Sequence, residues 1–403
     1  MKLAYYPGCS LGTSAVEYGI SMRRTAELMG IDLEEIQDWN CCGATSAHNT
    51  SKLLSLALPA RNLARAEQAG LDVLAPCAAC YNRFRATEHV IRKDSTTREK
   101  VQQAIEMDYQ ATNSTLSVLE LLAHKVGIEA IKSKVTNPLQ GMKAACYYGC
   151  LLVRPVELTG FDDPEDPQTM DNIVRALGAS TVEWAFKTEC CGASLATSRP
   201  DVGKKMIYEV LNNARQNGAE CIVTACPLCM MNLDMRQASV EKEFAVSFNI
   251  PIYYVTELLA IACGDSPRRV NTHRHFVEAA KYLDYIKNLP DQPVTEEKPV
   301  KAGAPQETKA ESETSEKLQP DSAADEAEAL QKKITGMIKG LEKNPDKMAA
   351  KLITDVERAK VLSQIILSDP KKTAKLAELM VTDKDKAAKV AEAFVTGELK
   401  KRG

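Results

Sequence analysis

A chain of 403 residues, 44% of them hydrophobic, is long enough for two or three domains with buried cores. Its formal net charge of -3 gives no basic footprint for nucleic acid, and the sequence lacks the apolar run of about eighteen residues that spans a bilayer. The first residues do not follow the pattern of an export signal. We therefore expect a cytoplasmic protein with no nucleic-acid partner and no direct membrane span.

Short apolar or β-branched runs alternate with longer stretches of helical apolar spacing. The runs that we predict to be buried strands are residues 2–6, 71–75, 143–148 and 221–225. The stretches that we predict to be helices are residues 16–29, 53–69 and 202–217. Gly70 and Gly218 follow the last two as stop signals. Strands that alternate with helices predict an α/β fold with parallel-type sheets.

The motifs of the first part of the chain recur in the same order in the second part. Three cysteine motifs correspond: Tyr5-Tyr6-Pro7-Gly8-Cys9 with Tyr147-Tyr148-Gly149-Cys150, Cys41-Cys42-Gly43-Ala44 with Cys190-Cys191-Gly192-Ala193, and Cys77-x-x-Cys80 with Cys226-x-x-Cys229. Two flanking motifs also correspond: Asn62-x-Ala64-Arg65 with Asn212-x-Ala214-Arg215, and Val118-x-Glu120-Leu121 with Val255-x-Glu257-Leu258. This repetition predicts duplicated domains over residues 1–135 and 136–288, related by pseudo-twofold symmetry.

The composition changes after residue 288. Residues 289–325 are rich in Pro, Glu, Lys, Ser and Ala and nearly free of large apolar side chains, which predicts a disordered linker. Residues 326–403 are rich in Ala, Lys, Leu and Glu and repeat an Ala-Lys-apolar unit, which predicts a small all-α module. This tail has no cysteine or histidine. We expect it to dock a partner rather than to hold metal.

The thirteen cysteines point to metal binding. A disulfide framework is a poor explanation, because cytoplasmic thiols are kept reduced. In both halves 34 residues separate the Cys-Cys pair from the Cys-x-x-Cys motif, whereas the preceding gap is 31 residues in the first half and 39 in the second. A constant gap beside a variable one indicates a constrained site and a loop insertion in the second half.

Five cysteines in each half favour an iron–sulfur cluster over zinc. Thiolates are the usual ligands of such clusters, and a structural zinc site is closed by four ligands. The negative charge of five thiolates is balanced more easily by several irons than by one zinc ion. Gly43 and Gly192 follow the Cys-Cys pairs, where they either let the backbone approach the cluster or take a positive φ. The first cysteine and the Cys-x-x-Cys motif of each half follow predicted strands, where α/β folds bind their ligands.

At these motifs the sequence resembles the cysteine-rich CCG-domain family, and most of all the B subunits of heterodisulfide reductases. The resemblance covers about residues 1–285 and rests on the motifs above together with Leu151-Leu152-Val153-Arg154-Pro155. It implies two noncubane 4Fe-4S clusters, which cleave a disulfide that lies between them, each capturing one sulfur. The implied cluster ligands, which are also the catalytic residues through the clusters, are Cys9, Cys41, Cys42, Cys77 and Cys80 for one cluster and Cys150, Cys190, Cys191, Cys226 and Cys229 for the other.

By this resemblance the chain is an oxidoreductase acting on sulfur groups, like the enzyme that reduces the coenzyme B–coenzyme M heterodisulfide. The implied partners are a ferredoxin-like iron–sulfur subunit of the C type, a flavin subunit of the A type, and a small disulfide or thiol. The ferredoxin-like cysteine run of other family branches is absent from the sequence, so electrons are expected to come from a separate subunit. Two alternatives stay open: a non-catalytic electron-transfer subunit of another complex, and a zinc-stabilised scaffold.

Several other residues have competing interpretations. Cys146, Cys221 and Cys263 lie outside the repeat and are expected to be small core hydrophobes. His48 is either a proton donor near the first site or a structural hydrogen-bonding residue. Arg154 either positions an anionic group or forms an ordinary surface salt bridge. His273 and His275 are expected to be exposed rather than bound to metal.

Overall fold

The computed structural model describes residues 1–289 apart from residue 45, and parts of residues 341–398. The chain forms two compact units, Met1–Thr308 and Lys309–Gly403. All thirteen cysteines belong to the first unit. The predicted linker over 289–325 falls outside the described residues except for its first residue.

The first half of this unit is built on a sheet of four parallel strands in the order β2-β1-β3-β4. Its strands are β1 (Lys2–Tyr5), β2 (Asp32–Glu35), β3 (Val73–Leu74) and β4 (Thr115–Leu116). The apolar β1 and β3 are buried in the middle of the sheet, as their sequences predict. The sequence Asp-Leu-Glu-Glu of β2 alternates between exposed and half-buried side chains, because this strand forms an edge.

Helices connect the parallel strands of the first half. They are α1 (Gly8–Leu11), α2 (Val16–Leu28), α3 (Ala47–Thr50), α4 (Lys52–Gln68), α5 (Ala78–Lys93), α6 (Ser95–Ile105), α7 (Val118–Glu120), the π-helical segment η1 (Leu121–Gly127) and α8 (Ile128–Lys134). The helices predicted over 16–29 and 53–69 are α2 and α4, and both are confirmed within one residue at each end. Ser51 caps α4, because its side chain accepts a hydrogen bond from the backbone amide of Leu54.

The second half repeats this architecture with the strand order β6-β5-β7-β8, again all parallel. Its strands are β5 (Lys143–Tyr147), β6 (Ser180–Thr181), β7 (Cys221–Thr224) and β8 (Ile252–Tyr254). Its helical elements are α9 (Thr169–Ala176), α10 (Leu195–Ser198), α11 (Pro200–Gln216), α12 (Pro227–Met230), η2 (Met231–Met235), α13 (Gln237–Phe244), α14 (Val255–Ala262), η3 (Thr272–Arg274) and α15 (Ala280–Lys287). The predicted duplication of an α/β domain is confirmed by the two sheets, whose strand orders correspond position by position.

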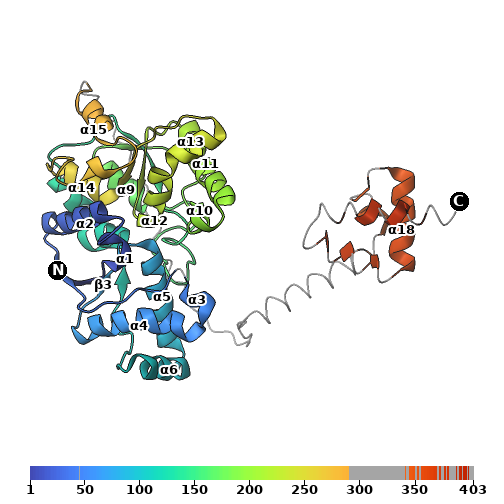
Figure 1. Ribbon diagram of the computed structural model, residues 1–403, viewed down its shortest axis with the longest axis horizontal. Helices are drawn as coiled ribbons and strands as arrows, with labels where there is room; N and C mark the ends of the chain where they lie inside the picture. Colours follow the sequence, from blue (N-terminus) through green and yellow to red (C-terminus); the bar gives the residue numbers. More distant parts are fainter. Residues whose placement is uncertain are drawn as a thin grey trace, which may run out of the picture. The chain divides into compact units, whose positions relative to one another are not determined.

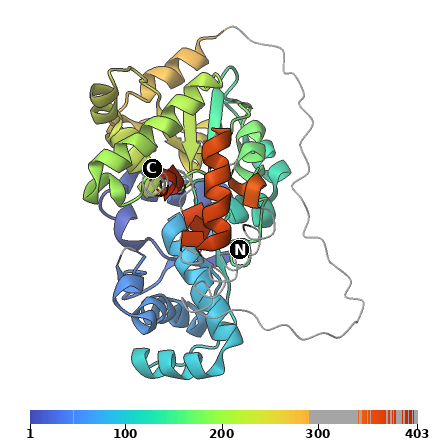
Figure 2. The same ribbon diagram turned by 90° about the vertical axis from the view of Figure 1, so that its right-hand side faces the viewer.

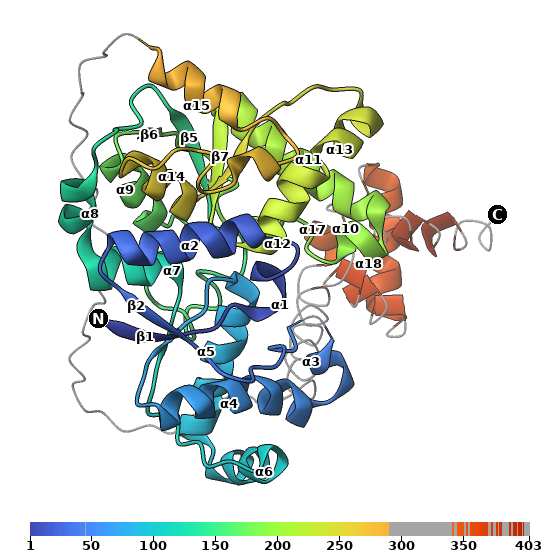
Figure 3. The ribbon, with the colours of Figure 1, turned by 60° about the vertical axis from the view of Figure 1, so that its left-hand side comes forward.

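The two halves pack through equivalent elements, as the expected pseudo-twofold arrangement requires. Helix α2, which follows the first strand of the first half, packs on α14 of the second half. In return α9, which follows the first strand of the second half, packs on α7 and η1. Figure 1 and Figure 2 show the blue-to-teal half against the green-to-orange half, and Figure 3 shows α2 running along their boundary beside α14.

The predicted helical character of the C-terminal region is also confirmed. Its described residues include α17 (Pro345–Ala349) and α18 (Val356–Ser368), and the side chain of Asp355 caps the latter. A separate apolar core holds these helices together, with Ile353, Leu362 and Ile366 nearly or fully buried. This core shows that the apolar positions of the tail pack within their own unit.

Candidate functional site

The ten predicted cluster cysteines fall at the carboxyl-terminal edges of the two sheets. Cys9 lies in α1, which begins shortly after the end of β1, and Cys150 follows the end of β5 at a similar distance along the chain. Cys77 and Cys226 follow β3 and β7, and each is the residue immediately before a helix, α5 and α12 respectively. The helix amides and the helix dipole therefore favour negative charge on the Cys-x-x-Cys sulfurs.

The first set of cysteines converges around a sulfur–sulfur contact. The Sγ atoms of Cys42 and Cys80 lie 3.1 Å apart, although 38 positions separate the two residues in the chain. The amide of Gly43 donates to the Cys41 Sγ at 3.4 Å. Cys9 and Cys41 are exposed, whereas Cys42 and Cys80 are buried, so this set opens to the surface on one side.

The second set has the same layout. The Sγ atoms of Cys191 and Cys229 lie 3.8 Å apart, again 38 positions from one another in the chain. Cys150 and Cys190 are half-buried, so the corresponding side of this set is less open than that of the first. The side-chain amide of Asn232 donates to the Cys191 Sγ at 3.4 Å and to the Cys191 carbonyl at 3.0 Å.

One buried tyrosine stands at the same place in each set. The Tyr6 hydroxyl donates to the carbonyl of Asn40, which directly precedes Cys41, at 2.9 Å. The Tyr147 hydroxyl donates to the carbonyl of Glu189, which directly precedes Cys190. Burial first, and then the nearby thiols of Cys80, Cys42, Cys41 and Cys9, raise the pKa of Tyr6. Burial and the thiols of Cys229, Cys191, Cys190 and Cys150 raise the pKa of Tyr147 in the same way.

This equivalence corrects the register of the first motif. Tyr6, and not Tyr5, corresponds to Tyr147, so Pro7 stands where the second half has Tyr148. Sequence comparison alone missed these tyrosines as site residues. Their equivalence could have been found from the sequence, because Tyr6 and Tyr147 each stand three positions before the first cysteine of their half, Cys9 and Cys150.

Glycines leave room for the sulfurs at two further positions that the sequence did not single out. Gly8 and Gly149 have positive φ angles of 62° and 67°. A Cβ at Gly8 would lie 3.5 Å from the Cys80 Sγ, and one at Gly149 would lie 3.1 Å from the Cys229 Sγ. At the predicted Gly43 and Gly192 the φ angles are 73° and 87°, so the positive-φ explanation of these glycines is confirmed.

The crowded thiols ionise only in part. Hydrogen bonds from Cys41 and Cys80 lower the pKa of Cys42 to about 3, and that same pairing with Cys42 raises the pKa of Cys41. In the second set a hydrogen bond from Cys150, and then one from Cys191, lowers the pKa of Cys190 to about 3. Full ionisation of either set thus requires added positive charge, which a group containing several irons provides.

The two sets meet at the boundary between the halves. The buried Cys77 and Cys226 lie close to each other, and the Cys226 thiol is the largest cause of the raised pKa of Cys77. The fully buried Tyr18 of α2 lies beside this pair. Its hydroxyl contacts the carbonyls of Pro76 and Ala225 at 3.2 and 3.1 Å. The two sets of cysteines therefore lie next to each other at this boundary.

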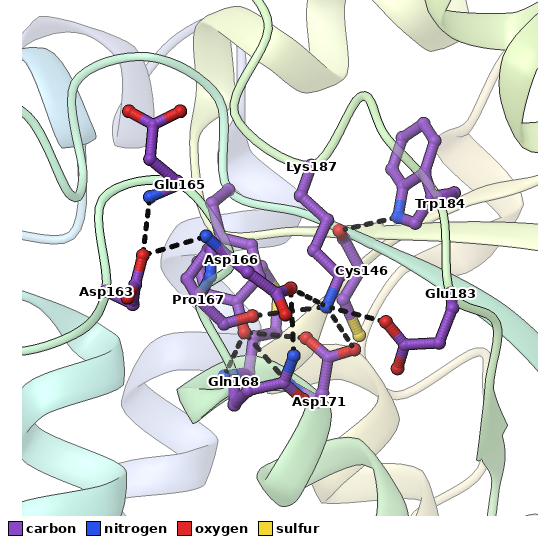
Figure 4. A network of polar contacts seen from close by, with 12 residues as sticks. Cys146, Asp163, Glu165, Asp166, Pro167, Gln168, Asp171, Glu183, Trp184 and Lys187 are labelled. Carbon is purple, nitrogen blue, oxygen red and sulfur yellow. Dashed lines mark hydrogen bonds and ion pairs between the residues drawn. The ribbon is translucent and has the colours of Figure 1, made fainter. Parts of the chain in front are cut away.

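A buried lysine near the second set, Lys187, lies among the carboxylates of Asp166, Asp171 and Glu183 (Figure 4). The Lys187 ammonium lies 2.9 Å from the Asp166 carboxylate and 3.4 Å from that of Asp171, and its side chain is only 2% exposed. The Lys187 carbonyl accepts hydrogen bonds from the amides of Tyr148 and Gly149, which directly precede Cys150. Asp171 in turn accepts from the Tyr148 hydroxyl at 2.7 Å. This network fixes the position of Cys150 relative to the pair at 190–191.

The predicted loop insertion lies in the same region. Between Cys150 and the start of α9 there are 18 residues, against six between Cys9 and the start of α2. Arg154 in this loop pairs with Glu165 at 3.0 Å and donates to Thr188 at 3.0 Å. The salt-bridge interpretation of Arg154 accounts for these contacts.

The structure places the remaining candidates in different surroundings. Cys146 and Cys221 are fully buried in strands, as expected, while Cys263 is only half-buried. His48 is exposed in α3, and both interpretations of it stay predictions. The expectation that His275 is exposed was wrong, because its side chain is 2% exposed and its Nε2 lies 3.0 Å from the Glu257 carboxylate.

The donor set fits an iron–sulfur group better than an isolated ion. Each half brings soft sulfur donors together beside positive-φ glycines and amide N–H groups. Throughout the part of the chain that the structure describes, no three His, Cys, Asp or Glu side chains form a site for a single metal ion. Across those same residues, no helix is both long enough and apolar enough to cross a membrane.

Comparison with known proteins matches the repeat directly. The cysteine-rich domain family CCG matches residues 3–85 and 144–234. The 8-methylmenaquinol:fumarate reductase membrane anchor subunit of Wolinella succinogenes is 34% identical over 70% of this chain and 98% of its own length. The B subunit of a ferredoxin:CoB-CoM heterodisulfide reductase of Methanosarcina mazei is 28% identical over 71% of this chain and 97% of its own length.

More distant similarities agree with this assignment. Lactate utilization protein A of Bacillus subtilis is 20% identical over 64% of this chain and 99% of its own length. The crystal structure of a hypothetical protein from Helicobacter pylori is similar with a TM-score of 0.56 and 12% identity. The matched region covers 69% of this chain and 52% of the Helicobacter pylori chain. That likeness concerns the fold alone. With both motif repeats matched and one relative 34% identical along nearly its whole length, the chain belongs to the cysteine-rich CCG-domain family that includes the B subunits of heterodisulfide reductases.

Proposed function

We propose that this protein is an iron–sulfur subunit of a multi-subunit oxidoreductase, that it holds two noncubane 4Fe-4S clusters, and that it reduces a small disulfide or oxidises the corresponding thiols. The ten cysteines named above would hold the clusters, five in each half. The observation that carries the proposal is the contact of the Tyr18 hydroxyl with the carbonyls of both Pro76 and Ala225, which directly precede Cys77 and Cys226 and so bring the two sets together. Two redox groups held side by side suit a reaction that needs two electrons.

The reaction balances with an external electron donor. A disulfide takes up two electrons and two protons and is split into two thiols. When bound, iron–sulfur clusters supply the one-electron steps. The electrons are expected to come from a ferredoxin-like subunit of the C type, served by a flavin subunit of the A type. The described residues include no ferredoxin-like cysteine run to replace them.

The chain's own residues hold the site in place. Tyr6 and Tyr147 anchor the backbone just before each Cys-Cys pair, and Lys187 anchors the backbone before Cys150. The exposed Cys9 and Cys41 mark the side from which a small molecule reaches the first set. The buried ring of Tyr18 excludes water from the boundary between the sets.

The test is to measure iron, acid-labile sulfide and the EPR spectrum of the full chain purified without oxygen. About eight irons and eight sulfides per chain are expected for two 4Fe-4S clusters. The proposal further predicts a new paramagnetic signal after oxidation in the presence of coenzyme M, and consumption of the coenzyme M–coenzyme B disulfide or of glutathione disulfide by the reduced protein. Zinc in place of iron would reject the proposal.

A second function is favoured by one specific observation. The relative at 34% identity is named as a subunit of a quinol:fumarate reductase, and it is more similar to this chain than the heterodisulfide reductase subunits at 27% and 28%. In this second function the chain passes electrons between partner subunits and does not act on a disulfide. Two clusters that show no response to thiols or disulfides would support it over the first.

The C-terminal unit is proposed to dock a partner subunit. The named relatives are matched over 97% or more of their own length by about 70% of this chain, so the tail lies beyond what they share with it. Its described helices bury their apolar side chains within their own core. A chain that ends after residue 289 is therefore expected to keep its iron and to lose binding to that partner.

A further inference from the structure

The boundary between the two halves contains one side chain that contacts both metal-site loops at once. Tyr18 belongs to α2 of the first half, and its hydroxyl lies 3.2 Å from the Pro76 carbonyl and 3.1 Å from the Ala225 carbonyl. These carbonyls occupy the same position in the two repeats, because each directly precedes the first cysteine of a Cys-x-x-Cys motif. A phenol has a single proton, so the two carbonyls share it.

The ring of Tyr18 is held as firmly as its hydroxyl. It stacks on Tyr254 with ring centroids 4.0 Å apart and an angle of 2° between the planes, and both side chains are fully buried. Tyr254 ends β8 and directly precedes α14. Tyr18 thus ties together the ends of three strands, β3, β7 and β8, which belong to different halves.

Further hydrogen bonds at the boundary keep α2 from sliding. The hydroxyl oxygens of Ser21 and Thr256 are hydrogen-bonded at 2.8 Å, and the Thr25 hydroxyl donates to the Thr256 carbonyl at 3.2 Å. From the same helix, Arg24 pairs with the nearly buried Asp265 at 2.6 Å. With its helix fixed in this way, Tyr18 has little freedom to follow a movement of either loop.

We propose that Tyr18 is a positioning residue that sets the separation of the two metal sites by sharing its hydroxyl proton between the carbonyls of Pro76 and Ala225. This inference rests on the proposed function, since it concerns two clusters held by the flanking cysteines. Removal of the hydroxyl leaves the cysteines in place but releases the restraint between Cys77 and Cys226. The interaction between the two sites should then weaken, while each site keeps its own metal.

The test is Tyr18→Phe in the full chain, loaded and purified without oxygen, with Tyr253→Phe as the matched control. Tyr253 is also fully buried and donates to a backbone carbonyl, that of Ala279, but it lies outside both cysteine sets. Expected for Tyr18→Phe are a wild-type iron content, a weaker spin–spin interaction between the two clusters in the EPR spectrum, and a change in the gap between their reduction potentials. The control should match the wild type in all three.

The outcomes separate the inference from the proposed function. If the wild type holds no iron, the proposed function fails first. If the wild type shows two interacting clusters and Tyr18→Phe leaves that interaction unchanged, the positioning role is rejected while the cluster assignment stands. If Tyr18→Phe does not fold, the second variant is Tyr254→Leu. It keeps the Tyr18 hydroxyl but removes the ring stacked on Tyr18, so the hydroxyl is no longer held between the two carbonyls. The interaction between the clusters must then weaken for the inference to hold.

Discussion

The Sγ atoms of Cys42 and Cys80 lie 3.1 Å apart, and the corresponding atoms of Cys191 and Cys229 lie 3.8 Å apart. In both halves this pair joins the Cys-Cys-Gly loop to the first turn of the helix that follows the central strand. The two sites are therefore two copies of one design. Each can be altered without changing any ligand of the other, so a substitution in one half has the other half as its internal reference.

Cys42→Ser and Cys191→Ser should each remove the metal of one half. Either change replaces a soft, buried thiolate with a hydroxyl, which is a poor ligand for iron. The expected result is a loss of about half of the iron and sulfide for each variant and of nearly all for the double variant. Cys263→Ser is the control, because Cys263 lies outside both sets and is half-buried. Equal losses in the control would show that the iron is not held by these sets.

Tyr6→Phe and Tyr147→Phe should act on one site each. Both remove a hydroxyl that donates to the carbonyl just before a Cys-Cys pair, so the expected loss of stability is about 1 kcal/mol per variant. The reduction potential of the site in the same half should shift, because the pair loses its anchor while every ligand remains. Potentiometric titration followed by EPR measures this shift. A shift of both sites by either variant would contradict the assignment of one tyrosine to each set.

Lys187→Met should be far more damaging than removal of a surface charge. It removes the ammonium that pairs with the fully buried carboxylate of Asp171, a change that typically costs about 3–5 kcal/mol. Lys187→Met combined with Asp171→Asn should recover part of this loss, because no unpaired charge remains. Lys2→Met is the control, since the Lys2–Glu34 pair is half exposed and its attraction is screened by solvent. Denaturant unfolding measures all of these changes, and equal losses for Lys187→Met and Lys2→Met would refute the prediction.

Most of the fold followed from the sequence, because the central strands are apolar and the helices have clear periodicity and stops. The edge strands did not follow from it: β2 reads Asp-Leu-Glu-Glu and β6 is only Ser180–Thr181, and neither shows a buried pattern. The cysteines were found because their spacing repeats. Lys187 was missed because a lysine in a polar loop is usually exposed, and only the fold brings Asp171 to it.

The role of Tyr18 was hidden for a different reason. Its hydroxyl contacts carbonyl groups 58 and 207 positions away, and those contacts depend on how the two halves pack. The repeat predicts that the halves are similar, but it does not say which helix lies at their boundary. Asn62 and Asn212 are the opposite case, in which matching sequence motifs make different contacts. The side chain of Asn62 bonds to the backbone of Asn40, just before a Cys-Cys pair, whereas that of Asn212 accepts from Arg215.

His275 should make the stability of the first unit depend on pH. Burial lowers its pKa, but the nearby carboxylates of Glu257, Asp234 and Glu17 outweigh this effect and raise the pKa to about 9. The folded state therefore binds the proton more tightly than the unfolded chain, whose histidine has a pKa of about 6.5. The stabilisation is complete below about pH 6.5 and disappears as the pH rises through about 9, with a total of roughly 3 kcal/mol.

Denaturant unfolding of the wild type and of His275→Gln at pH 6.5 and pH 9 measures this effect. The free energy of unfolding of the wild type should fall between these values by more than that of His275→Gln. Titration of the thiols is common to both proteins and cancels in the difference. His273→Gln is the control, because His273 is exposed in η3 and should leave the dependence on pH unchanged. A wild type and a His275→Gln variant with the same dependence on pH would show that the buried pair with Glu257 does not titrate in this range.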